Sequence, residues 1–187
     1  LHKNIQEKIR KEIQDVLGDK IPTSLDDLTR LTYVRAVIKE TLRHSGTSNL
    51  TLRKLDRDFL IQNKYFIPKD AFVVIPTRLL HRNSDYWSNP DEFDPDRFME
   101  TNEKVENRPR MAYVPFGFGA RSCLGQRFAM NTLSLIACLF VRKFDIDAVT
   151  KEDEIVWKTN IFSDHSSNGI WLRFSPRNEG RQSSQIE

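Results

Sequence analysis

The stretch Phe116-Gly117-Phe118-Gly119-Ala120-Arg121-Ser122-Cys123-Leu124-Gly125 leads directly into the most apolar helical pattern of the chain, residues 126–141. Its three glycines permit positive φ angles and a close approach of the backbone to something flat or bulky. A cysteine just before a helix N-terminus has its thiolate stabilised by the helix dipole and by free N–H groups. Arg121 adds positive charge that can neutralise the thiolate or hold a carboxylate of a ligand. These features favour a deprotonated sulfur that faces a docked, planar, anionic partner.

The cysteines of the chain restrict the possible metal sites. A closed zinc site needs four ligands, and the sequence contains neither a Cys-x-x-Cys motif nor a pair of histidines to supply them. A single thiolate from Cys123 can serve instead as the proximal ligand of haem iron, because the porphyrin nitrogens supply the equatorial bonds. The alternative is a buried structural cysteine in a glycine-rich turn. Cys138 lies in an apolar run and is interpreted as a core residue, so two separate thiols in a reducing compartment are expected.

The pattern Phe116-x-x-Gly119-x-Arg121-x-Cys123-x-Gly125 resembles the haem-binding loop of the cytochrome P450 family of haem-thiolate monooxygenases. Two further motifs stand in the family's order. The first, Glu40-Thr-Leu-Arg43, resembles its Glu-x-x-Arg helix motif, and the second, Phe93-Asp-Pro-Asp-Arg97-Phe98, resembles the segment whose arginine completes a Glu-Arg-Arg triad. The resemblance runs from residue 1 to about Arg177 and implies the C-terminal portion of the cytochrome P450 fold.

The resemblance also implies a role for each residue of the loop. Cys123 would be the axial thiolate ligand of the iron of haem b, and Phe116 would pack against its sulfur. Arg121 would neutralise a haem propionate. Arg53 would reach a propionate too, and a surface arginine is the alternative for it. The expected cofactor-binding set is completed by Gly119 and Gly125.

The residues Glu40, Arg43 and Arg97 are expected to form a structural triad. An isolated Glu-x-x-Arg pair on an exposed helix contributes only about 0.2–0.5 kcal/mol, and such a pair is the alternative interpretation. Residues 81–110 have no sustained period, however, and so long an irregular stretch is usually functional or firmly held. The resemblance implies that the triad fixes this stretch beneath the haem. His81, at its start, is expected either to bind a propionate or to be satisfied by the backbone.

Apolar periodicity predicts the secondary structure around these motifs. The fold class is α+β, mainly α with small antiparallel β-sheets. The pair Asn168-Gly169 predicts a hairpin between residues 155–161 and 170–174. Asp70 is expected at a positive φ in a turn. Helices are predicted over 2–17, from a capped start at Ser24, over 31–43 and over 126–141, the last as a buried core helix, and short antiparallel strands over 59–61, 66–67 and 72–75.

Composition and charge exclude several classes of protein. The 187 residues contain 29 Lys+Arg and 26 Asp+Glu, and the net charge of +3 is spread along the chain, so a nucleic-acid partner is not expected. The longest apolar stretch, residues 128–141, falls short of the roughly 20 residues that span a bilayer. The chain lacks an initiator Met and is already amphipathic at residue 5, so we expect a fragment. Its expected parts are 1–177, the C-terminal haem-binding part of the domain, and 178–187, a mobile polar tail.

By resemblance, the reaction is an oxidation in which one atom of O₂ enters a lipophilic organic substrate with electrons from a redox partner. Residues Gly125–Met130 resemble microsomal members, which favours an NADPH-dependent reductase over a ferredoxin as the electron donor. The whole protein is then expected at the cytoplasmic face of the endoplasmic reticulum membrane, with the mitochondrial inner membrane as the alternative. Membrane association would come only through a region upstream of residue 1.

Two other functions remain open at this point. The family's oxygen-activating helix would lie upstream of residue 1, so the chain could be a truncated, non-catalytic product that cannot hold haem by itself. A haem-thiolate isomerase or dehydratase is the third possibility, because it would share the cysteine loop. No motif of the chain indicates the substrate.

Overall fold

The computed structural model describes residues 2–46, 48–99, 108–160 and 163–177. The segment 178–187, for which a mobile tail was predicted, lies outside these ranges. The helices are α1 (Lys3–Leu17), α2 (Leu25–Arg30), α3 (Thr32–His44), α4 (Thr77–Leu80) and α6 (Gln126–Lys143), with short 3-10 turns η1 (Pro95–Phe98), η2 (Arg110–Ala112), η3 (Gly119–Arg121) and η4 (Glu152–Glu154).

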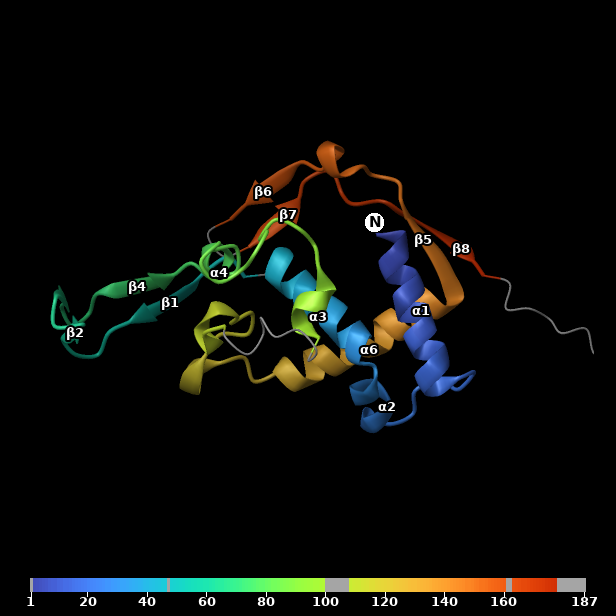
Figure 1. The fold of residues 1–187 in the computed structure, drawn as a ribbon. Coiled ribbons are helices and arrows are strands. Elements are labelled where there is room, and N and C mark those ends of the chain that lie inside the picture. Colours follow the sequence, from blue (N-terminus) through green and yellow to red (C-terminus); the bar gives the residue numbers. More distant parts are fainter. Residues whose placement is uncertain (1, 47, 100–107, 161–162, 178–187) are drawn as a thin grey trace, which may run out of the picture.

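Three helices, α1, α3 and α6, meet at the centre of the molecule and carry most of its core (Figure 1). In α1, the apolar residues Ile5, Ile9, Ile13 and Leu17 recur every four residues, so they lie on one face of the helix, and all four are buried. α2 begins with a capping box, in which the Ser24 hydroxyl accepts from the Asp27 N–H and the Asp27 carboxylate accepts from the Ser24 N–H. The core cluster is formed by Ile5, Ile9, Ile13, Leu17, Leu28, Leu31, Tyr33, Val34, Ile38, Met130, Cys138 and Val141.

α6 was predicted to be a buried core helix, and this prediction is wrong for one of its faces. Met130, Cys138 and Val141 pack into the core as expected. On the remaining surface, however, large apolar side chains are exposed among the described residues, including Phe128 at 77%. The apolar content of a helix predicts burial, but it does not tell which faces of the helix are covered by other elements. The other exposed residues of this face are Leu133, Ile136 and Phe140.

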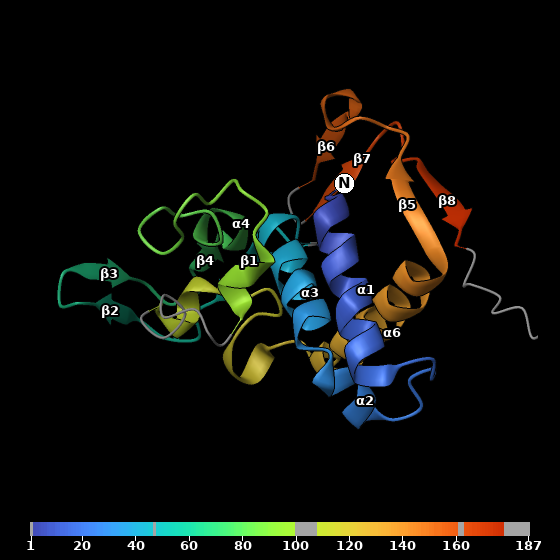
Figure 2. The same cartoon turned by 45° about the vertical axis from the view of Figure 1, so that its right-hand side comes forward.

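The strands form four two-stranded antiparallel sheets within the described ranges. β2 (Phe59–Ile61) and β3 (Tyr65–Ile67) are joined by a three-residue loop, residues 62–64, in which Gln62 and Asn63 have positive φ angles of 52° and 53°. Asp70 has a φ of 67°, as expected. Figure 2 shows this hairpin at the end of an arm continued by β1 and β4, far from β5 and β8. The remaining pairs are β1 (Thr51–Lys54) with β4 (Phe72–Ile75), β5 (Phe144–Ala148) with β8 (Leu172–Pro176), and β6 (Trp157–Thr159) with β7 (Asp164–Ser166).

The hairpin predicted at Asn168-Gly169 is not formed, because the strands on its two sides belong to different sheets. β6 pairs with β7, whereas β8 returns to β5. Gly169 still adopts a φ of 78°, but Asn168 uses its side chain to hold the preceding turn. Its Oδ1 accepts from the N–H of Val156 at 3.0 Å, and its Nδ2 donates to the carbonyl of Glu154 at 2.8 Å. The pair therefore redirects the chain between two sheets.

The helices of the described part are not suited to cross a bilayer, since none is both long and apolar enough. The most apolar of them, α6, ends at Lys143 with two basic residues in its last turn. Basic side chains at this end interact favourably with the helix dipole.

Truncation of Ile13 tests the packing of the helical core. Ile13 is 1% exposed at the centre of the cluster, so Ile13→Ala is expected to lower the free energy of unfolding by about 2–5 kcal/mol. Ile21→Ala is the matched control, because Ile21 is 58% exposed and should lose less than about 0.5 kcal/mol. Denaturant titration of both variants measures the difference, and equal losses would contradict the packing described.

Candidate functional site

The cysteine loop is held in shape by its own backbone. The N–H of Cys123 donates to the carbonyl of Phe116 at 2.8 Å, which closes the loop at its base. Inside it, Ser122 N–H donates to Gly119 O at 3.0 Å. Gly117 and Gly119 have φ angles of 74° and 75°, a region that side chains with a Cβ rarely adopt, so the path requires glycine at both positions. The loop therefore has its shape in the protein alone.

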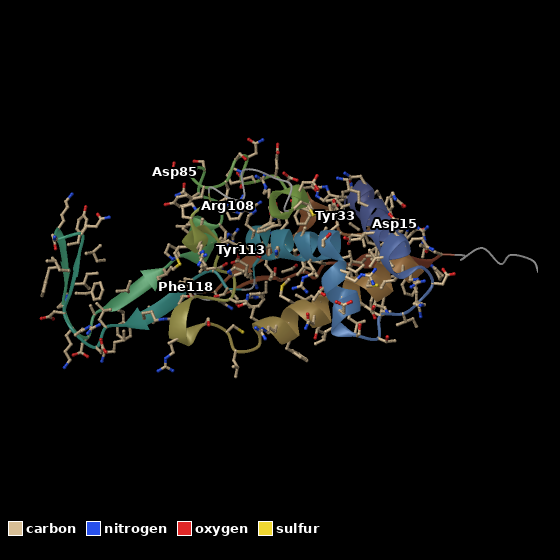
Figure 3. The ribbon with its side chains drawn as sticks, turned by 60° about the horizontal axis from the view of Figure 1, so that its bottom comes forward. Asp15, Tyr33, Asp85, Arg108, Tyr113 and Phe118 are labelled. Carbon is tan, nitrogen blue, oxygen red and sulfur yellow. The ribbon has the colours of Figure 1, made fainter. Side chains whose placement is uncertain are left out.

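The thiol of Cys123 is exposed and lies among exposed apolar side chains. Cys123 precedes Gly125, the N-cap of α6, and its carbonyl accepts from Gln126 N–H at 3.4 Å. A Cβ on Gly125 would lie 3.9 Å from the Cys123 sulfur, so Gly125 borders the thiol directly. The exposed apolar side chains of this segment are those of Phe118, labelled in Figure 3, Leu124 and Phe128.

These residues fit a planar, largely apolar group that binds through sulfur, as the predicted haem does. An exposed thiol can bind iron, and apolar side chains around it favour an apolar partner over water. The side chain of Arg121 is exposed, and its guanidinium has no hydrogen-bond or ion-pair partner in the described part of the chain, so it is available to an anionic substituent. The Phe116 ring is half-buried against the helical core, and its contact with a ligated sulfur stays a prediction.

Glu40 and Arg43 form a fully buried ion pair on α3. Arg43 Nε donates to one carboxylate oxygen of Glu40 at 2.7 Å, and its Nη2 donates to the other at 2.8 Å. The remaining donors of Arg43 reach backbone carbonyls of the irregular stretch, at 2.9, 2.7 and 3.0 Å, so every N–H of the guanidinium is used. The three carbonyls belong to His81, Pro90 and Glu92.

Arg97, on η1, approaches the same carboxylate from the irregular stretch. Its Nε lies 3.5 Å from Glu40 Oε1 and 3.9 Å from Asp94, close enough for an ionic contact but without hydrogen-bond geometry. Its two Nη atoms donate to the carbonyls of Ser88 and Asn89. Glu40 Oε1 also accepts from Asp94 N–H at 2.8 Å. The structure thus brings the three predicted triad residues together around one carboxylate.

An aromatic cluster that the sequence analysis did not identify packs beside this triad. Trp87 is fully buried, and its indole N–H donates to Leu80 O at 3.2 Å. The guanidinium carbon of Arg108 lies 3.7 Å from the centre of the Trp87 ring, a cation–π contact. Figure 3 labels Arg108 and Tyr113 in this layer. Phe98 and Tyr113 complete the cluster, with ring centres 4.8 Å apart. Aromatic residues in an otherwise polar stretch, Trp87 and Phe98, were the available signal.

The structure satisfies the His81 ring through the backbone. Its Nε2 accepts from Val114 N–H at 2.9 Å, and the residue is 3% exposed. Burial, and next the nearby charge of Arg43, lower the pKa of His81 to about 4. Arg53 lies half-buried on β1, where its Nη1 donates to the carbonyl of Leu52 at 2.9 Å. This hydrogen bond does not join Arg53 to the cysteine loop, so its link to a propionate stays a prediction.

Apart from the cysteine loop, a hollow of about 880 Å³ lies between the end of α3, the irregular stretch and the sheets of the C-terminal part. At its edge, Asp164 on β7 accepts from Asn49 Nδ2 at 2.9 Å and pairs with Arg78. This contact joins the stretch after α3 to a strand more than a hundred residues later. Among the described residues, no cluster of three or more His, Cys, Asp or Glu side chains could hold a metal ion.

Neutralising Glu40 tests the triad. Glu40→Gln leaves two buried guanidinium groups without their counter-charge, so the free energy of unfolding should fall by about 3–5 kcal/mol. Asp15→Asn removes the partner of Lys11 in an exposed pair at 2.6 Å, and it should change stability by no more than about 0.5 kcal/mol. Denaturant titration at neutral pH compares the two variants. A small loss for Glu40→Gln would contradict the arrangement described.

Acid should destabilise the fold through His81. The ring is neutral in the folded state, whereas the unfolded chain takes up a proton near the ordinary pKa of 6.5. The unfolded state therefore binds more protons between pH 6.5 and 4, and stability falls as the pH falls through this window. Between pH 6.5 and pH 4, the difference in the free energy of unfolding between wild type and His81→Gln should change by about 3 kcal/mol. His165→Gln, at an exposed position on β7, should keep the wild-type dependence.

The chain is similar to cytochrome P450 proteins along most of its length. The family model described as Cytochrome P450 matches residues 1–171. Cytochrome P450 4V2 of Rattus norvegicus is 38% identical over 177 residues, which cover 94% of this chain and 33% of the rat protein. Cytochrome P450 3A5 of Homo sapiens is 36% identical over 157 residues, 84% of this chain and 30% of the human protein. Cytochrome P450 4g15 of Drosophila melanogaster is 32% identical over 179 residues, 95% of this chain and 31% of the fly protein.

The chain spans about a third of the length of the curated relatives it matches. The match extends from the first helix to the loop before β8, so it includes the buried pair of α3, the irregular stretch and the cysteine loop. Together with the geometry of that loop, this match assigns the family. The chain belongs to the cytochrome P450 family.

Proposed function

We propose that this chain is the cysteine-bearing part of a haem-thiolate monooxygenase that oxidises a lipophilic organic substrate with O₂. One observation carries the proposal: an exposed thiol at the head of α6, framed by exposed apolar side chains, in a segment that the family model covers. A thiol that served only the core would be buried, as Cys138 is, where burial raises the pKa of the thiol.

In this proposal each residue of the loop acts on haem b in a defined way. The sulfur of Cys123 would hold the iron, and Gly119 and Gly125 would leave room for the close approach of the macrocycle. Arg121 offers its unpaired guanidinium to a propionate. Arg53 offers its remaining donors to the other propionate. When bound, the haem would supply the redox chemistry for the cleavage of O₂: with two electrons from the redox partner and two protons, one oxygen atom would enter the substrate and the other would leave as water.

The buried triad acts as scaffold in this proposal and makes no contact with the reacting atoms. Glu40 and Arg43 hold the irregular stretch by backbone carbonyls, and the cysteine loop follows that stretch in the chain. A rigid support fixes the position of a metal ligand, which tunes the strength of the metal–sulfur bond. The support here rests on charges that are fully desolvated and therefore hard to displace.

The partner and the compartment are proposed from the resemblance of Gly125–Met130 to microsomal members. An NADPH-dependent reductase would supply the electrons, and the whole protein would lie at the cytoplasmic face of the endoplasmic reticulum membrane. A ferredoxin and the mitochondrial inner membrane are the alternatives. The names of the relatives given above specify no substrate, so the substrate is proposed only as a lipophilic small molecule.

Replacement of the two cysteines tests the ligand. The chain extended to the length of its relatives should bind haem, and after reduction its carbon monoxide complex should show the red-shifted Soret band of a thiolate ligand. Cys123→Ser should abolish that band, because a hydroxyl does not replace the thiolate. Cys138→Ala, which changes the buried cysteine, should keep it.

The same experiment separates the competing functions. An unchanged Soret band in Cys123→Ser would overturn the assignment of the ligand. Haem binding by the extended form but not by the 187-residue chain would favour a chain that is non-catalytic by itself. Conversion of an organic peroxide without electrons or O₂ would favour the isomerase or dehydratase.

A further inference from the structure

We propose that His81 is a positioning residue for Cys123: its imidazole holds the backbone segment on which the ligand loop closes. The proposal rests on the function proposed above, because it concerns the geometry of the same thiolate. The family motifs discussed earlier assign no such role to this histidine. It lies at the start of the irregular stretch, 42 positions before the cysteine in the sequence.

The first step of the argument is the hydrogen bond between the ring and the loop segment. Val114 N–H donates to His81 Nε2 at 2.9 Å, and both residues are buried. An accepting Nε2 carries no proton, so the neutral ring has its proton on Nδ1. The low pKa of His81 keeps this acceptor available at neutral pH. Without it, a buried backbone N–H would lose its partner, which costs about 1–3 kcal/mol.

The second step leads from Val114 to the sulfur. Val114 uses its N–H on His81 and its carbonyl on Gly117 N–H, at 3.0 Å, so it is held on both sides. Two residues later, the carbonyl of Phe116 accepts from Cys123 N–H at 2.8 Å. The backbone of the ligand is therefore bonded to a segment whose position the histidine fixes. A shift of Val114 would be passed to Cys123 through these short links.

The third step shows what fixes the histidine. Its N–H donates to Thr77 O at 2.9 Å, within the last turn of α4. Its carbonyl accepts from Arg43 Nη1 at 2.9 Å, and its ring lies 5.4 Å from the Tyr113 ring. The backbone of His81 is thus held by Arg43 of the buried ion pair, and its side chain in turn holds Val114. Through these two hydrogen bonds, one to its carbonyl and one to its ring, His81 connects Arg43 to the segment that enters the cysteine loop.

The lifetime of the iron–thiolate bond tests this role in the full-length, haem-loaded protein. His81→Gln can place an acceptor oxygen near the Nε2 position, whereas His81→Asn is one methylene too short to reach Val114. In the reduced carbon monoxide complex, His81→Asn should lose the thiolate Soret band on the order of 10-fold faster than wild type. His81→Gln should restore the wild-type rate. Should His81→Asn not fold, His81→Leu replaces it as the variant without an acceptor.

Two controls separate positioning from loss of stability. Tyr113→Phe removes the hydroxyl that donates to Lys39 O at 2.9 Å, in the same layer, and leaves the bond between His81 and Val114 intact. It should lower the free energy of unfolding without shortening the lifetime of the Soret band. His165→Asn, at an exposed position, should change neither quantity. Equal lifetimes for His81→Asn and Tyr113→Phe, or failure of His81→Gln to restore the rate, would overturn the proposal.

Hydrogen exchange of the Val114 amide tests the contact without haem. In the apoprotein, exchange should be fast in His81→Asn and slow in His81→Gln, and equal protection in both variants would overturn the proposal. A wild-type protein with no thiolate Soret band at all is a different outcome. It would refute the proposed function, while the exchange experiment would still decide whether the histidine holds the loop.

Discussion

The carboxylate of Glu40 has no access to solvent, and the surrounding fold is arranged to satisfy it. A buried charge of this kind is tolerated only when it is paired and fully hydrogen-bonded. Arg43 supplies the pairing from the next turn of α3, and Arg97 adds a second positive charge from η1. These guanidinium groups then need acceptors of their own, which they find in backbone carbonyls of the irregular stretch. The order of that stretch follows from the burial of one anion.

The position of the cysteine loop depends on this buried ion pair. Trp87, Phe98 and Tyr113 fill the space beside the ion pair and connect it to the segment that enters the loop. The loop adds an internal hydrogen bond at its base and two glycines with positive φ. Its outer surface is apolar and exposed, so the part that would meet a ligand is the part that the described residues leave open. The inner side of the loop is thus held rigidly by the fold, and its outer side is accessible.

The sequence predicted the features that depend on local patterns. The boundaries of α1, α3 and α6, to within two residues, and the positive φ of Asp70 follow from periodicity and residue type. Two features that depend on distant partners were not predicted from local patterns. Asn168-Gly169 has hairpin chemistry, but β5 takes the strand that follows it. From the sequence, the His81 ring could bind either a propionate or the backbone. Only the fold shows that its partner is the N–H of Val114.

The five N–H groups of Arg43 have consequences for the order of residues in its motif. Two of them satisfy the carboxylate, and three reach carbonyls of the irregular stretch. An exchange of Glu40 and Arg43 would keep both charges and their separation on the helix, yet it would present a carboxylate where donors are required. A lysine would offer three donors from one atom and could not form the same planar fork. The order of the motif, with glutamate before arginine, is therefore imposed by uncharged peptide carbonyls rather than by the ion pair itself.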